Sequence, residues 1–406
     1  MATVVTALDL PVLDTFGLER DVASARTRQV AAQSWIAKSD LGYAVLRYDE
    51  VVAVLRERRF HNALSQIPRM NAMDDGEVGE FFGGRRRSIL ATEGDEHLRL
   101  RRLVSRAFTP AAADRHRPVM REVLSGLLDP LGGDGVVEAV AEICEPYPIP
   151  VICEVLGAPK EDWRLFSQWA VGIFKIFNGN LSEDLPDIKA AAEAIAAYVA
   201  NLVEARRLDP RPDLLSDLIA AEEAGDRLST DELCMLAEAV LMAGTDTTRN
   251  QLACCLAVLA TRPAQWAALR ADPSLLPGAV EELMRYLGAV RGTIRIASCD
   301  VEFNDVVFPQ GTLVSVSLAT ANVDPAVFTD PEVLDVTTTR TAQQLTFGSG
   351  IHHCLGAALA RAELQEALGV LTERWSAIEL DGEVTWKPAT FGIWGPARLP
   401  LRVTMA

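Results

Sequence analysis

Apolar residues recur at helical spacing along most of the chain. The segments 118–131 and 188–207 carry apolar side chains three and four positions apart, which predicts amphipathic helices. The segment 229–263 is the longest of this kind, and Ser229 with Glu232 forms a capping box at its start. A helix of roughly 30 residues is about 45 Å long, so this segment is predicted to cross the width of the molecule.

Strand patterns are fewer and shorter. The runs that alternate or are rich in β-branched residues are 42–48, 300–305, 312–320 and 399–405. The chain has no repeats, no low-complexity tracts and no linker long enough to separate domains. The pattern predicts a mainly helical protein with a small β portion, folded as one domain over residues 1–406.

Composition and charge narrow the class of protein. The chain has 406 residues, of which 49% are hydrophobic, and a net charge of −17, which argues against a nucleic-acid partner. The seven cysteines are odd in number and form no C-x-x-C pair, which favours a reducing compartment. The beginning of the chain has neither a basic leader nor an apolar run of membrane-spanning length. We therefore expect a soluble cytoplasmic protein with no membrane partner.

The stretch LTFGSGIHHCLG, residues 345–356, places two histidines against a cysteine in a glycine-rich turn. Zinc would need about three more ligands, and adjacent His352 and His353 do not have the usual ligand spacing. A cysteine nucleophile needs an oriented base, and none is recognisable. A helical pattern follows Cys354 directly, so its sulfur should lie at a helix N-terminus, where a thiolate is stabilised. A ligand for a larger, flat cofactor is the favoured interpretation, because the glycines allow close approach.

The pattern F-x-x-G-x-x-x-C-x-G in this stretch resembles the haem-binding signature of the cytochrome P450 family. It comprises Phe347, Gly350, Cys354 and Gly356. The resemblance covers essentially the full chain and implies the cytochrome P450 fold, with haem b buried between a long distal helix and the helix after the cysteine. It also implies that Cys354 is the axial ligand of the haem iron, whose thiolate favours O–O cleavage. His352 would contact a haem propionate.

The motif AGTDTT, residues 243–248, interrupts the longest helical pattern. Serine, threonine and aspartate are poor helix-interior residues, and such local conflicts are expected at functional sites. The apolar flanks favour burial. The motif begins at Ala243 and resembles the A-G-x-D-T-T motif that the same family has where this helix passes over the haem. By that resemblance Thr247 would hold and protonate reduced dioxygen, Asp246 would relay protons, and Gly244 would leave room for O2 and a local widening of the helix.

The resemblance also supplies a structural ion pair and further cofactor contacts. The E-x-x-R pair is Glu282 with Arg285, and Arg340 is the candidate for the third member, although it lies later than the family pattern places it. The propionates need cations, and the matching positions are His97, Arg101 and Arg295.

Substrate contacts are expected after the E-x-x-R helix and in a turn near the C-terminus. The positions are Val290, Arg291, Gly292, Phe391 and Ile393. A proline common in the first segment is replaced by Ala289. These residues are mostly small and apolar, which suits a hydrophobic substrate of moderate size, whereas Arg291 more often points to solvent or to a propionate than to substrate.

The resemblance implies a monooxygenase that inserts one atom of O2 into a hydrophobic small molecule by hydroxylation or epoxidation. Electrons from NAD(P)H would arrive through a ferredoxin or flavodoxin and a ferredoxin reductase, since no reductase domain is present, and the protein would be a monomer. Oxidative coupling, ring closure or C–C cleavage is the alternative reaction. A non-catalytic haem-thiolate sensor is a second alternative.

Overall fold

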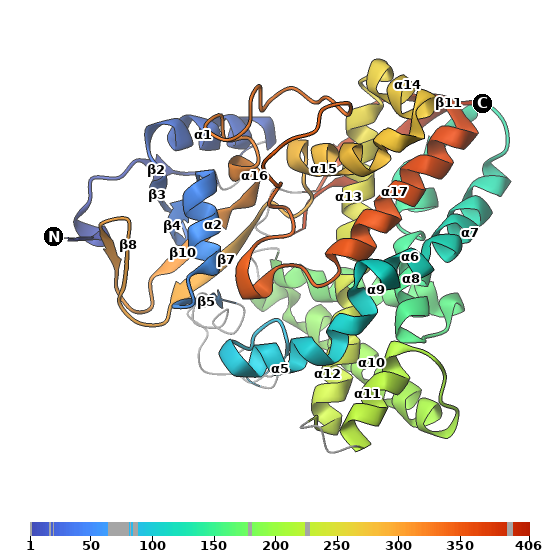
Figure 1. The fold of residues 1–406 in the computed structure, drawn as a ribbon, viewed down its shortest axis with the longest axis horizontal. Helices are drawn as coiled ribbons and strands as arrows, with labels where there is room; N and C mark the ends of the chain where they lie inside the picture. Colours follow the sequence, from blue (N-terminus) through green and yellow to red (C-terminus); the bar gives the residue numbers. More distant parts are fainter. Residues whose placement is uncertain are drawn as a thin grey trace.

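The structure is a computed structural model that describes residues 2–15, 18, 20–63, 81, 83, 88–177, 181–223, 228–387 and 393–406. Helices fill one side of the molecule, and the N-terminal strands with α1 and α2 form the other side (Figure 1). The helices are α1 Arg20–Gln33, α2 Tyr48–Arg56, α5 Gly94–Val104, α6 Pro110–Arg115, α7 Arg117–Leu128, α8 Pro148–Leu156, α9 Trp163–Phe174, α10 Leu181–Leu208, α11 Leu214–Glu223, α12 Thr230–Ala243, α13 Asp246–Leu259, α14 Pro263–Ala271, α15 Leu276–Tyr286, α16 Leu318–Ala321 and α17 Ala357–Arg374.

The strands form small sheets. They are β1 Thr3–Val4, β2 Val12–Leu13, β3 Ile36–Ser39, β4 Gly42–Val45, β5 Phe60–Asn62, β6 Gly135–Glu138, β7 Gly292–Ala297, β8 Val301–Phe303, β9 Val306–Phe308, β10 Leu313–Ser317, β11 Trp375–Leu380, β12 Thr385–Trp386, β13 Pro396–Arg398 and β14 Pro400–Met405. The largest sheet has the order β2-β3-β4-β10-β7-β5. In it β10 runs parallel to β4 and antiparallel to β7, with Val314 opposite Arg295. The smaller sheets are β1-β9-β8, β11-β14-β6 and the hairpin β12-β13.

Most of the predicted elements are present with shifted ends. The segment 118–131 is α7 followed by a 3₁₀ turn, and 188–207 is α10, which begins earlier, at Leu181. The predicted strand 399–405 is β14. The mainly helical fold with a small β portion is confirmed.

Three strand predictions were too long, each for a local reason. The run 42–48 ends as a strand at Val45 because α2 begins at Tyr48. The run 300–305 is only the first arm of a hairpin, since Asn304 and Asp305 turn with φ of 48° and 60°. The run 312–320 ends at Ser317, whose hydroxyl accepts a hydrogen bond from the Thr320 amide and caps α16.

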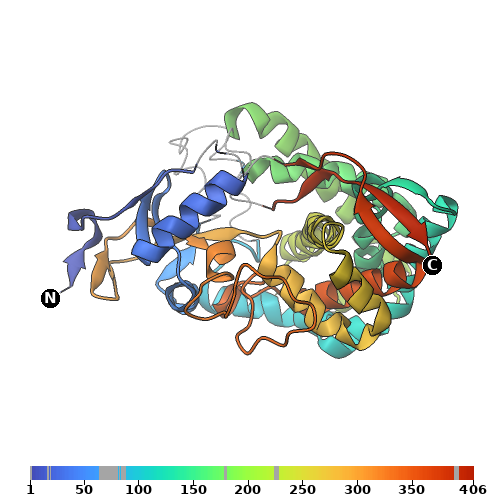
Figure 2. The same ribbon diagram turned by 90° about the horizontal axis from the view of Figure 1, so that it is seen from above.

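The long central helix is two helices rather than the single predicted one. The capping box at Ser229 and Glu232 is present, but the helix stops at Ala243 and α13 starts at Asp246. Gly244 and Thr245 form the break, where the Thr245 hydroxyl donates to the Met242 carbonyl at 2.8 Å. The polar side chain thus satisfies a backbone group that a continuous helix would use. In Figure 2 this central helix is viewed along its axis.

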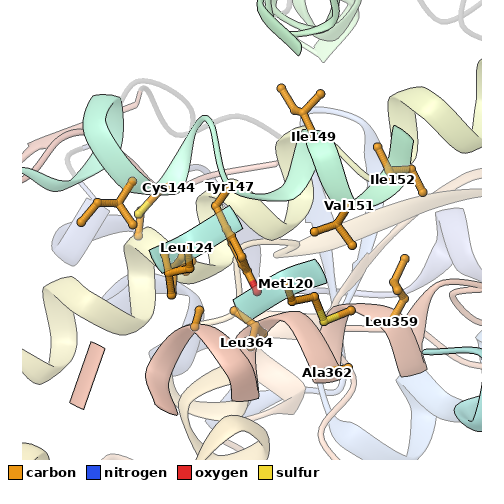
Figure 3. Close-up of a cluster of buried hydrophobic side chains, with 14 of the residues drawn as sticks. Met120, Leu124, Cys144, Tyr147, Ile149, Val151, Ile152, Leu359, Ala362 and Leu364 are labelled. Carbon is orange, nitrogen blue, oxygen red and sulfur yellow. The ribbon is translucent and has the colours of Figure 1, made fainter. Parts of the chain in front are cut away.

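The core beneath the cysteine turn is built from α7, α8 and α17 (Figure 3). Met120 and Leu124 of α7 and Val151 of α8 are fully buried against Leu364 of α17. Each such side chain contributes about 1.5–3 kcal/mol by its burial. The buried Tyr147 donates its hydroxyl hydrogen to a backbone carbonyl of α17, that of residue 363, at 2.8 Å. This packing fixes the helix that follows the cysteine.

Within the described ranges, no one helix has both the length and the hydropathy of a membrane span. The stretch Thr230–Leu259 joined to Pro263–Ala271 meets both requirements only as a pair, and the pair is bent by 108°.

Candidate functional site

A cavity of about 350 Å³ separates the central helix from the cysteine turn. Cys354 and Thr247 both line it, from opposite elements. Its apolar lining includes Ile89, Leu90, Ile152, Leu236, Ala239, Val240, Ala243, Ala289, Val290 and Leu318. The cavity therefore places the Cys354 sulfur and the Thr247 hydroxyl on a lining with a large apolar part.

The cysteine turn depends on left-handed glycines. Gly348 and Gly350 have φ of 69° and 74°, and the Cys354 amide donates to the Phe347 carbonyl at 2.9 Å. The sulfur is accessible to the cavity and enclosed by protein elsewhere. Burial raises the pKa of Cys354, and the Gly356 amide and the more distant arginines oppose this only in part. The start of the helix alone therefore does not lower the pKa of this thiol below its usual value.

Gly350 approaches another helix rather than open space in the cavity. A Cβ atom there would lie 2.2 Å from the Leu55 carbonyl oxygen at the end of α2. The expectation that the glycines serve close approach to a flat partner is therefore incomplete, because at this position the close partner is backbone.

Two cations line the cavity, of which Arg295 is buried and Arg101 is half-buried. Arg295 is 3% exposed and donates to the Thr293 hydroxyl and the Ile294 carbonyl, and its burial lowers its pKa to about 10. Arg101 donates to the Ile351 carbonyl at 3.4 Å, and burial lowers its pKa as well. In the part of the chain that the structure describes, no carboxylate lies within ion-pairing distance of either arginine.

His97 and His352 complete this rim, with ring centroids 4.3 Å apart. Both ring nitrogens of His97 lie 3.0 Å from backbone carbonyls, of Ile89 and Ile351, and burial lowers its pKa. A neutral imidazole donates only one of these two bonds. His97 and Arg101, and Arg295 from a distant part of the sequence, thus line the same cavity.

His352 lines the cavity and also pairs with a carboxylate that the sequence did not indicate. Its Nε2 lies 2.9 Å from a carboxylate oxygen of Glu93. Burial raises the pKa of Glu93, but the His352 ring and the Asn62 amide outweigh it and hold that pKa below its usual value. Glu93 was missed from the sequence because nothing in its neighbourhood marks it as the partner of a residue 259 positions later. His353, by contrast, contacts the Phe347 ring.

The polar break in the central helix presents Thr247 to the cavity. Its hydroxyl donates to the Ala243 carbonyl at 2.8 Å, across the break. The Asp246 carboxylate is buried and lies 3.4 Å from both Lys387 Nζ and an Arg249 guanidinium nitrogen. Burial lowers the pKa of Lys387, and Asp246 opposes this. Lys387 comes from the C-terminal hairpin, so no local sequence pattern could associate it with Asp246.

Gly244 serves helix packing more directly than it serves a small ligand. A Cβ atom there would lie 2.7 Å from Ile152 Cγ1 of α8. The close contact of α12 with α8 therefore requires glycine, and the predicted local widening is the break itself.

A buried acid, Glu363 of α17, also lines the cavity. It is 2% exposed, and Thr248 Oγ1 donates to it at 3.1 Å. Burial raises its pKa to about 8, while the hydrogen bond from Thr248 lowers it. The sequence carries one signal that could indicate this residue, namely an acid on the inward face of an otherwise apolar helix stretch.

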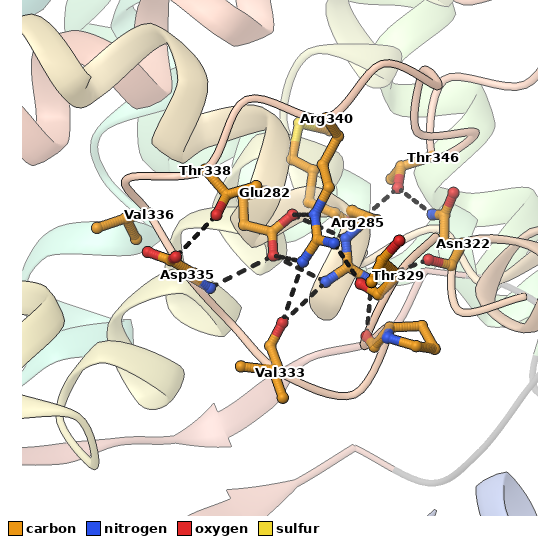
Figure 4. A network of polar contacts seen from close by, with 12 residues as sticks. Glu282, Arg285, Asn322, Thr329, Val333, Asp335, Val336, Thr338, Arg340 and Thr346 are labelled. Atoms are coloured by element: carbon orange, nitrogen blue, oxygen red, sulfur yellow. Dashed lines mark hydrogen bonds and ion pairs between the residues drawn. The ribbon is translucent and has the colours of Figure 1, made fainter. Parts of the chain in front are cut away.

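The ion pair predicted from E-x-x-R lies away from the cavity and fixes the loop before the cysteine turn (Figure 4). Glu282 and Arg285 are each 1% exposed and pair at 2.8 Å. Arg340 pairs with the same carboxylate at 2.9 Å and is the third member. Arg285 also donates to the carbonyls of Asn322 and Pro331.

The expected substrate residues divide between two sites. Val290 lines the cavity and pairs with Ile393 in an isolated β-bridge. Arg291 and Gly292 instead line a separate cleft of about 790 Å³ between α1, α13 and the hairpin β12–β13. Arg291 stacks over the Trp394 ring at 5.3 Å and points away from the cavity, because successive residues of an extended segment face opposite sides. Phe391 lies outside the described residues.

Comparison with known proteins adds family relationships to this geometry. Residues 158–391 match the family model described as Cytochrome P450. Luteothin monooxygenase of Streptomyces thioluteus is 34% identical over 399 residues, covering 97% of this chain and 96% of the relative. Mycinamicin IV hydroxylase/epoxidase of Micromonospora griseorubida is 38% identical over 365 residues, covering 88% and 89%. The solved structure of the cytochrome P450 enzyme CxnD for C–S bond formation in chuangxinmycin biosynthesis has a TM-score of 0.84 and 30% identity, covering 94% of each chain.

Proposed function

The chain belongs to the cytochrome P450 family, and from that premise we propose how its own residues carry out the reaction. It is a monooxygenase of that family, an oxidoreductase that uses haem, O2 and reducing equivalents. Family members work with redox partner proteins and hydrophobic substrates. The roles of single residues, the haem type, the electron donor and the substrate are our proposals.

The cavity fits haem b by the chemistry of its donors. Cys354 would ligate the iron, and Arg101, Arg295 and His97 would hold the propionates. The observation that carries this is that the buried Arg295 and the half-buried Arg101 both line the cavity, with no carboxylate within ion-pairing distance of either in the described ranges. Two propionates would satisfy them. When bound and reduced, the haem supplies dioxygen activation, in which one oxygen atom enters the substrate and the other leaves as water.

Thr247 and Asp246 would manage the protons that this reaction consumes. The Thr247 hydroxyl has donated its hydrogen to Ala243, so its lone pairs remain to accept a hydrogen bond from the cavity. Asp246 is held by Lys387 and Arg249, and Lys387 is 26% exposed. A proton entering at this charged cluster would reach Asp246 and then the hydroxyl.

The apolar lining supports a neutral hydrophobic substrate of moderate size, hydroxylated at carbon or epoxidised. Coupling chemistry is the second candidate, because the CxnD structure is described as an enzyme of C–S bond formation. A reaction of the first kind places an atom of labelled O2 in the product, and a coupling reaction does not.

Electron supply would come from a ferredoxin or flavodoxin with its reductase, in the cytoplasm, to a monomeric single-domain enzyme. Arg102 on α5 and Arg106 in the 3₁₀ turn that follows it are exposed and available to an acidic partner. Arg99 is less available since it pairs with Glu232, and Arg361 pairs with Glu281 while stacking over Phe347.

One spectrum tests the haem assignment. The reduced, carbon monoxide-bound protein should absorb at about 450 nm if a cysteine thiolate ligates the iron. Cys354→Ala should lose this band, whereas Cys299→Ala, at an exposed cysteine outside the cavity, should keep it. A band that persists in Cys354→Ala would remove Cys354 from the role of ligand.

A further inference from the structure

Gln251 connects the central helix to the segment that carries Val290. It lies one helical turn after Thr247 on α13, so both side chains are on the same face, and both line the cavity. Its Oε1 accepts a hydrogen bond from the Ala289 amide at 2.8 Å, and its Nε2 donates to the Leu287 carbonyl at 3.1 Å. Only this orientation of the amide satisfies both partners. We call this pair of bonds the Gln251 clasp.

The segment held by the clasp is also held from its other side. The Trp394 amide donates to the Ala289 carbonyl at 2.9 Å, and Val290 bridges Ile393. Both backbone groups of Ala289 are therefore used, one toward α13 and one toward the C-terminal segment. Val290 follows directly and presents its side chain to the cavity. The position of this wall is therefore set jointly by α13 and by Ile393 and Trp394, which precede β13.

The clasp depends on the identity of residue 289. A proline at this position has no backbone N–H, so Gln251 Oε1 would lose its donor. Gln251 is 4% exposed and Ala289 is 1% exposed, so water cannot readily replace the bond. A buried glutamine and a residue with a free amide are thus required together.

We propose that Gln251 is a positioning residue for ligand selectivity. By fixing Leu287 and Ala289 to α13, it holds Val290, which forms one wall of the cavity, at a set distance from Thr247 on the same helix. Ligands that reach this wall are selected by it, and ligands too small to reach it are not. This inference rests on the proposed haem site, which the first titration below tests separately.

Two nitrogen-donor probes separate wall contact from iron binding in the haem-loaded protein. Imidazole is small and reports ligation alone, whereas 4-phenylimidazole also fills the cavity above the iron. Both are titrated by the shift of the Soret band, and the ratio of the two dissociation constants is the readout. Gln251→Met keeps the side-chain length and removes both polar groups, and Ala289→Pro removes the amide hydrogen while leaving Gln251 unchanged. Cys255→Ala is the matched control, because its sulfur accepts a long hydrogen bond of 3.7 Å from Gln251 Nε2 but does not hold Leu287 or Ala289.

We expect each clasp variant to weaken 4-phenylimidazole relative to imidazole by about threefold or more, corresponding to a loss of a fraction of one hydrogen bond. The double variant should lose no more than the larger single loss, since Gln251→Met already removes the bond that Ala289→Pro removes. The control should keep the parent ratio. An unchanged ratio in both clasp variants, or losses that add in the double variant, overturns the proposal. If Gln251→Met fails to fold, Ala289→Pro decides alone. A parent protein that shows no imidazole shift overturns the haem assignment instead.

Discussion

Replacing Glu363 by glutamine should stabilise the protein, and the stabilisation should grow as the pH rises. Burial raises the pKa of Glu363 from 4.5 to about 8, and the hydrogen bond from the Thr248 hydroxyl lowers that pKa only in part. The folded state therefore keeps a proton that the unfolded state releases between these two values. Since the folded state binds more protons, stability falls with rising pH across this window and levels off above about pH 8.

The size of the effect follows from the shift in pKa. Each pKa unit corresponds to about 1.4 kcal/mol, so the carboxyl costs about 3 kcal/mol at pH 7 and about 5 kcal/mol well above pH 8. A glutamine side chain is neutral at every pH and still accepts the hydrogen bond from Thr248. The difference in unfolding free energy between Glu363→Gln and the parent should therefore increase by about 2–3 kcal/mol from pH 6 to pH 9.

Urea unfolding of the haem-loaded proteins, followed by tryptophan fluorescence at half-unit pH steps, measures this difference. Contributions of the cofactor are common to both proteins and cancel in the difference. Thr248→Val is the companion variant: it removes the hydrogen bond that lowers the pKa, so in the parent background the pH-dependent loss should extend to higher pH. In the Glu363→Gln background Thr248→Val should leave the pH dependence unaltered. Parallel stability curves for the parent and Glu363→Gln would refute the reasoning, because they would mean that the buried carboxyl is already ionised.

Three other substitutions have defined outcomes. Thr247→Ala should continue to consume NADH, but a larger share of the electrons should be released as hydrogen peroxide, and Thr247→Ser should restore the coupling of NADH consumption to product. An alanine variant with full coupling would exclude the Thr247 hydroxyl from proton transfer. Glu282→Gln should lower the unfolding free energy by about 3–5 kcal/mol, because it leaves guanidinium groups without a counter-charge. Arg340→Met should lower it by less, since the Arg340 side chain is 16% exposed, and equal losses in denaturant titrations would contradict this. Gly350→Ala should lower the unfolding free energy by about 1–3 kcal/mol or more, given a φ of 74° and a backbone oxygen 2.2 Å from the new Cβ. Gly278→Ala, at an open helical position, should be tolerated, and equal midpoints of thermal unfolding for the two variants would contradict this.

The sequence predicted those parts of the site that lie within short motifs. The cysteine turn, the AGTDTT break and the E-x-x-R pair each combine residues a few positions apart, so their local chemistry is visible in one dimension. The overall helical fold followed from apolar periodicity. The extent of the β-strands did not, because Ser317 and Tyr48 begin helices through capping and backbone geometry that a run of β-branched residues does not reveal.

The remaining contacts depend on tertiary structure and had no local signal. Glu93 meets His352, and Lys387 meets Asp246, across separations of 259 and 141 residues. The direction of the Arg291 side chain could not be predicted from the sequence pattern either, because it depends on which side of the extended segment faces the cavity. The pairing of Gln251 with Ala289 could be noticed from the sequence only as an absent proline, and its meaning required the geometry of the amide.

Residues at both ends of α2 connect the strand-rich part of the molecule to the cysteine turn. Tyr48 donates its hydroxyl hydrogen to the Gln343 carbonyl at 2.8 Å, Arg56 donates to the Ser349 hydroxyl at 3.0 Å, and the Leu55 carbonyl abuts Gly350. The strand-rich part of the molecule that contains α2 thus holds the turn that carries Cys354. If Cys354 ligates the haem iron, as proposed, the absorption spectrum of the loaded protein also depends on this part of the molecule. A change in the packing around α2 should then alter the spectrum, without a label and without substrate.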